Sequence, residues 1–128
     1  LAARVWKVPA KQRSQAILAT HYVKAFAFDI DTLRHPRLAD LDGIVQLAAA
    51  RGWKLYFNLL PENTEMATQL LGDTLTPMIR RNAAFLVRRY DQAPATLVNQ
   101  LEILPNAHFV DQSWTTEHYD EFGRRKVA

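Results

Sequence analysis

Residues 53–60 read WKLYFNLL and are followed at once by Pro61. A near-continuous apolar run of this length, stopped by a residue that cannot donate to a neighbouring strand, predicts a buried β-strand. Just upstream, residues 37–51 carry apolar side chains at helical spacing, and Gly52 follows where a helix commonly ends. This alternation of helix and buried strand favours an α/β fold with a mainly parallel sheet.

The rest of the chain continues the same alternation. A second strand is predicted over residues 22–30 (YVKAFAFDI), which are rich in aromatic and β-branched residues and run into acidic ones. After Pro61 the pattern predicts a helix over 62–71, with Asn63 as its N-cap, and a second helix that begins with Thr76 as cap and Pro77. It then predicts a strand over 96–100, a short edge strand over 108–110 and a terminal helix from Tyr119 onward.

Ligands of parallel α/β sheets bind outside the carboxyl ends of the strands. The residues that follow each predicted strand are therefore the candidate site residues. They are Asp29, Asp31, Asn58, Asn63, Asn99 and the segment 111–118.

The composition indicates one domain over residues 1–128. The chain has 128 residues, 48% of them hydrophobic and 23% charged, which is ordinary for a globular domain. Its 16 basic and 13 acidic residues give a net charge of +3, which excludes the strongly basic composition of a nucleic-acid-binding domain. No apolar stretch reaches the roughly 18 residues of a membrane span. The absence of cysteine excludes disulfides, thiolate metal sites and cysteine nucleophiles.

Residues 109–128 read FVDQSWTTEHYDEFGRRKVA, with a histidine on a loop and a glycine five positions later that opens the closing helix. This spacing, at His118 and Gly123, resembles the last conserved block of SGNH (GDSL-type) hydrolases. The segment WKLYFNLLPENTE, with its turn at Pro61 and Asn63, resembles the relatives that act in D-alanyl or acyl transfer at the cell envelope. The resemblance implies a three-layer α/β/α sandwich of the flavodoxin-like type.

The resemblance also implies a site. His118 is then the general base that activates a serine, and no metal or organic cofactor is needed. The family places the acidic partner three residues before the histidine, where this chain has Thr115. The candidates to replace it are Glu117, Asp111 and Asp120. Asn63 and Trp114 are expected to contact substrate, although a helix cap and a packing residue are the simpler interpretations of the two.

The family's nucleophile has no counterpart in this chain. Its serine lies in a Gly-Asp-Ser segment after the first strand, whereas Ser14 and Ser113 stand in the contexts KQRSQ and DQSWT. We therefore expect residues 22–128 to correspond to the C-terminal part of a hydrolase domain, inactive without upstream residues. The expected substrate is an ester-linked acyl group on a small molecule or glycan, and the family suggests the cell envelope or periplasm.

Two alternatives belong to other classes. The segment AFAFDIDTL resembles the first motif of haloacid dehalogenase-like phosphatases, with Asp29 as nucleophile and Asp31 beside it around Mg²⁺, although Thr32 comes one residue early. A non-catalytic α/β binding module is the other alternative, and buried, hydrogen-bonded side chains at Glu117 and His118 would favour it. His21, His35 and His108 are expected to be structural or to face solvent.

Overall fold

The computed structural model describes residues 9–33, 35–115 and 118–128. The predicted regions 37–51, 53–60, 62–71 and 96–100 all take the expected secondary structure, with ends shifted by a few residues. In chain order the elements are η1 (Ala10–Gln12), α2 (Arg13–Phe26), α3 (Ile30–Leu33), α4 (Pro36–Ala50), β1 (Leu55–Leu59), α5 (Thr64–Leu71), η2 (Gly72–Thr74), α6 (Thr76–Tyr90), β2 (Ala95–Asn99), η3 (Asn106–His108) and α7 (Glu121–Val127).

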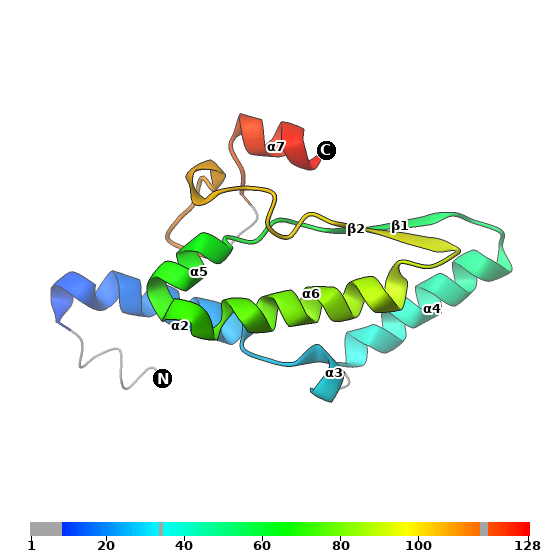
Figure 1. Ribbon diagram of the computed structural model, residues 1–128, viewed down its shortest axis with the longest axis horizontal. Helices are drawn as coiled ribbons and strands as arrows, with labels where there is room; N and C mark the ends of the chain where they lie inside the picture. Colours follow the sequence, from blue (N-terminus) through cyan, green and yellow to red (C-terminus); the bar gives the residue numbers. More distant parts are fainter. Residues whose placement is uncertain (1–8, 34, 116–117) are drawn as a thin grey trace.

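The two strands form a parallel pair, so the chain is an α/β protein. Leu55 pairs with Ala95 at one end and Leu59 with Asn99 at the other. The connection between the strands runs through α5, η2 and α6, as a parallel crossover requires (Figure 1). One face of the pair is covered and carries Leu97, which is buried. The other face carries Tyr56, which is 69% exposed.

The strand predicted over residues 22–30 is wrong, because residues 22–26 are the last part of helix α2. Short apolar runs do not distinguish a strand from a buried helix. Here Leu18 and Tyr22 lie one helical turn apart, are both buried, and share a core cluster with Phe26. Asp29 consequently follows a helix and not a strand.

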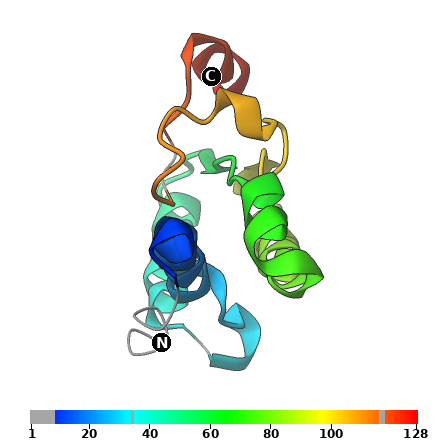
Figure 2. The same cartoon turned by 90° about the vertical axis from the view of Figure 1, so that its left-hand side faces the viewer.

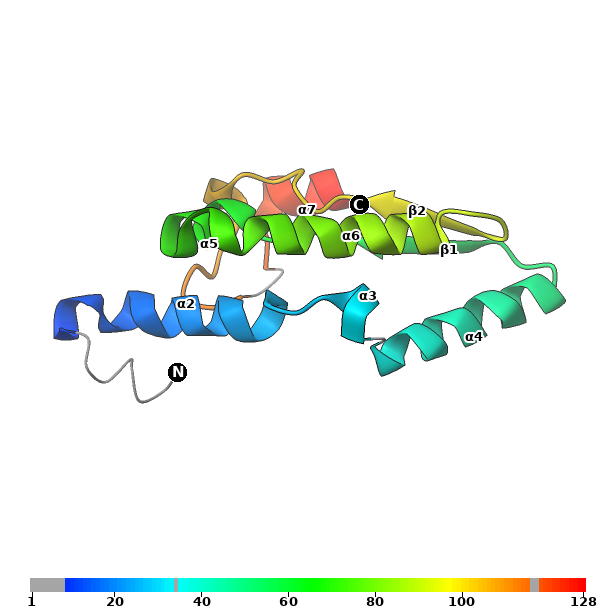
Figure 3. The same ribbon diagram turned by 60° about the horizontal axis from the view of Figure 1, so that its bottom comes forward.

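The main core lies between α2, α5, α6 and the loop that follows β2. Figures 2 and 3 show α2 in one layer and the α5–α6 pair in a second layer beside it. Burial raises the pKa of Tyr22 to about 12, with a further contribution from the negative charge of Glu62. The buried residues of this cluster are Leu18, Tyr22, Ala67, Leu75, Ile79, Ala83 and Leu101.

Caps and glycines set several helix ends. Gly52 and Gly72 have φ values of 66° and 62°, a conformation that glycine adopts without steric cost. The Asn63 side chain accepts a hydrogen bond from Met66 N at 3.0 Å, which confirms its predicted N-cap role. Thr76 does not cap α6 as predicted. It is the first residue of the helix, and its hydroxyl bonds to that of Thr68 at 2.8 Å.

Candidate functional site

The segments that follow β1 and β2 lie against each other, as expected for the carboxyl ends of parallel strands. Gln100 N donates to Leu59 O at 3.0 Å, and Glu62 N donates to Leu101 O at 3.0 Å. These bonds continue the contact between the two chain segments past the last paired residues of the sheet. Residues 59–62 and 100–101 thus form a platform at the strand ends. The hydroxyl of Tyr119, in the C-terminal segment, donates to Pro61 O of this platform.

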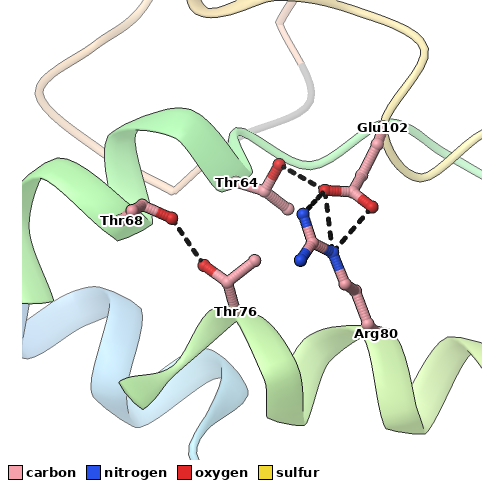
Figure 4. Close-up of polar contacts among 5 residues, drawn as sticks. All are labelled: Thr64, Thr68, Thr76, Arg80 and Glu102. Atoms are coloured by element: carbon pink, nitrogen blue, oxygen red, sulfur yellow. Dashed lines mark hydrogen bonds and ion pairs between the residues drawn. The ribbon is translucent and has the colours of Figure 1, made fainter. Parts of the chain in front are cut away.

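Charged and hydroxyl side chains hold this platform to the helices (Figure 4). Arg80 on α6 makes hydrogen bonds to both carboxylate oxygens of Glu102, the shortest at 2.7 Å. Thr64, the first residue of α5, donates to the same carboxylate at 3.1 Å. The bonds from Arg80, and then from Thr64, lower the pKa of Glu102. Glu102 therefore joins the loop after β2 to both crossover helices.

Asn63 is built into the platform from two sides. Its Nδ2 donates to Asn106 Oδ1 at 2.7 Å, while its Oδ1 caps α5. Asn106 N in turn donates to Glu65 at 2.8 Å. The side chain of Asn63 is buried, and the structure shows it as a structural cap. Its contact with substrate stays a prediction.

His118 lies at the end of a loop that starts at Phe109. Phe109 and Tyr119 form an isolated antiparallel bridge, and Val110 N donates to His118 O at 2.8 Å. The bridge replaces the short edge strand predicted over residues 108–110. His118 is exposed, which does not favour the binding-module alternative. Glu117 lies outside the described residues.

Asp111 is the carboxylate that the structure relates to His118. Its Oδ1 accepts hydrogen bonds from Ser113 Oγ at 2.7 Å and from Ser113 N at 3.1 Å. These two bonds lower the pKa of Asp111, and the positive charge of His118 lowers it further. Asp111 is thus ionised at neutral pH and lies within electrostatic reach of the histidine. Of the three acidic candidates, Asp120 forms a side-chain bond with His108.

Trp114 packs against helix α2. Its ring centroid lies 3.7 Å from that of His21, with the planes tilted by 44°. The indole is still 49% exposed. The contact fits the packing interpretation of Trp114, and the remaining exposed area leaves room for a substrate contact.

The sequence did not predict that His108 and Asp120 form a pair. His108 Nδ1 lies 2.8 Å from Asp120 Oδ2, and the His108 ring stacks on Phe122 at 4.3 Å. Asp120 is also the N-cap of α7, because its Oδ1 accepts from Gly123 N at 2.7 Å. The bond to His108, and then the bond from Gly123, lower the pKa of Asp120. The terminal helix was predicted from Tyr119 onward, so Asp120 was expected inside that helix, whereas the structure places it at the N-cap.

The comparisons with known proteins add no relatives. No family model, no curated protein and no solved structure matches this chain. The candidate site is therefore defined by the geometry of its residues and by the local spacing of His118 and Gly123.

The phosphatase alternative expected Asp29 directly after a strand, whereas the structure has a helix before it. Asp29 is in the loop between α2 and α3, where its carboxylate pairs with Arg81 at 3.4 Å and accepts from Asp31 N at 3.1 Å. Within residues 9–33, 35–115 and 118–128, no group of three or more acidic or histidine side chains is arranged to hold a metal ion. Over the same ranges, no helix has both the length and the apolar character needed to cross a bilayer.

Proposed function

We propose that this chain is the C-terminal part of a serine esterase or acyl-transfer enzyme of the SGNH type. The proposal is carried by His118, which is exposed and precedes Tyr119, the residue bonded to Pro61 O just after β1, and by the ionised Asp111 in electrostatic reach. A general base needs a position that is open to a reacting group. The nucleophile is a serine upstream of Leu1, and the substrate is an ester-linked acyl group.

In this reaction the serine hydroxyl attacks the ester carbonyl while His118 takes its proton. The same histidine then protonates the leaving alcohol. Asp111 takes the part of the acid that Thr115 cannot fill, since its ionised carboxylate is the acidic group in electrostatic reach of His118. Trp114, half exposed in this loop, is a wall for the acyl group or a sugar ring.

The uncovered side of the sheet supports a larger three-layer sandwich. Parallel sheets are normally covered on both faces. Here Tyr56 and Val98 are exposed on neighbouring strands, and Ile44 and Leu47 are nearly half exposed on α4. We propose that upstream strands and helices of the same domain cover these residues. A Tyr56→Cys variant then reacts with a maleimide quickly in this cysteine-free chain and slowly in the longer protein.

The test of the enzyme uses the product of the complete reading frame, assayed with p-nitrophenyl acetate in the presence of EDTA. We expect a Gly-Asp-Ser segment upstream and metal-independent hydrolysis. His118→Ala should lower kcat by roughly 10³-fold or more, on the pattern of other triad histidines. His35→Asn is the control, because His35 caps α4 through Nδ1 and asparagine keeps that cap. Full hydrolysis by His118→Ala, or an upstream sequence without such a serine, would refute the proposal.

A further inference from the structure

The loop that carries His118 is closed at its base by two backbone bonds. Val110 N donates to His118 O at 2.8 Å, and Asp120 N donates to His108 O at 3.0 Å. Together with the bridge between Phe109 and Tyr119, these bonds form a two-stranded neck at residues 108–110 and 118–120. The place of His118 is therefore set by the neck.

The buried side of the neck is fixed by aromatic residues. Phe109 and Tyr119 are both buried and meet edge to face, with ring centroids 5.5 Å apart. Tyr119 also donates its hydroxyl to Pro61 O at 2.9 Å, in the segment that follows β1. This side of the neck is thus tied to the platform at the strand ends.

The outward side of the neck carries both histidines. Phe109 and Tyr119 are buried, whereas Val110 and His118 are exposed and the side chains of His108 and Asp120 are 27% and 41% exposed. Val110 is 65% exposed and contributes little packing there. On this side the described residues are joined by the bond between His108 Nδ1 and Asp120 Oδ2, a contact of 2.8 Å to a carboxylate whose pKa is lowered.

The same carboxylate extends this connection to helix α7. Asp120 uses one oxygen for His108 and the other for Gly123 N. Two positive groups lie nearby on α7. Arg124 donates to Tyr119 O at 3.1 Å, and Lys126 lies 5.9 Å from the centre of the Phe122 ring on which His108 stacks. The bonds from His108 and Gly123, with the charge of Arg124, lower the pKa of Asp120 and keep its carboxylate ionised at neutral pH.

We propose that His108 and Asp120 are positioning residues, whose side-chain bond closes the neck and holds His118 in place relative to Asp111. The role of this positioning in catalysis rests on the proposed function. The geometric part does not, because it concerns the described chain alone. His108 and Asp120 touch neither substrate nor nucleophile in this scheme and act through His118.

The test compares His108→Ala with the parent chain and with His35→Asn by NMR. We expect amide exchange at Val110 and Asp120 to rise by roughly tenfold or more in His108→Ala, with β1 unchanged, since only a local opening is eased. A second readout is the carboxyl ¹³C shift of Asp111 at constant pH, which should change in His108→Ala as His118 moves relative to that carboxylate.

The longer protein gives a third readout that separates the two proposals. We expect His108→Ala to lower kcat by about 10²-fold with little change in KM, as a displaced catalytic group does. Asp120→Asn, which keeps an oxygen for the α7 cap, should behave alike. If the amide exchange and the Asp111 shift change but the parent shows no hydrolysis, the positioning stands and the proposed function fails. Hydrolysis in the parent, with exchange, Asp111 shift and kcat all unchanged in His108→Ala, would overturn the positioning alone.

Discussion

Tyr119→Phe removes a single hydroxyl that links the C-terminal segment to the end of β1. In the structure this hydroxyl donates to Pro61 O at 2.9 Å, and both residues are buried. Phenylalanine keeps the ring and its edge-to-face contact with Phe109. The substitution therefore isolates one buried hydrogen bond.

The expected loss of stability follows from that bond. A neutral hydrogen bond contributes about 1 kcal/mol net, and a buried carbonyl left without its donor adds a desolvation penalty, so we expect a loss of about 1–2 kcal/mol. For a chain of this size such a loss lowers Tm by roughly 3–8 °C. In urea the unfolding midpoint should fall by about 0.5–1 M with an unchanged slope.

Urea unfolding followed by far-UV circular dichroism measures this change. Tyr56→Phe is the matched control, because it removes the same hydroxyl from a side chain that is 69% exposed. The control should stay within about 0.5 kcal/mol of the parent chain. If the free energies of unfolding of Tyr119→Phe and Tyr56→Phe agree within that margin, the hydroxyl of Tyr119 does not anchor the segment and the reasoning is wrong.

Three further substitutions probe packing and charge. A Cβ at Gly123 would lie 2.8 Å from the Cβ of Tyr119, so Gly123→Ala should destabilise the chain by about 1–3 kcal/mol in the same assay. Gly43→Ala on helix α4 meets no atom within 4 Å and should stabilise it by up to about 1 kcal/mol; the opposite order would contradict the packing at α7. The lowered pKa of Glu102 stabilises the folded chain at pH values above 4.5, the ordinary pKa of this group. This stabilisation is lost as the pH falls through the lowered pKa. Arg80→Met should therefore flatten the decline of stability below about pH 4.5, and parallel curves would show that the pair has no such effect.

The sequence by itself determined most of the local elements. The strand at β1 could be predicted because a continuous apolar run ends at Pro61. The end of α4 and both ends of α5 followed from local signals, namely Gly52, Asn63 and Gly72. These signals act within a few residues, so no knowledge of the tertiary structure was needed to interpret them.

The tertiary structure decided what the sequence pattern left ambiguous. Residues 22–26 fit a strand by composition, and only their packing with Leu18 against α5 and α6 makes them a helix. The candidate site shows the same division. The spacing of His118 to Gly123 was visible in the sequence, whereas the pairing of His108 with Asp120 depends on a chain reversal that brings the two residues together. Contacts between residues far apart in sequence are set by the packing of whole elements, which local periodicity does not encode.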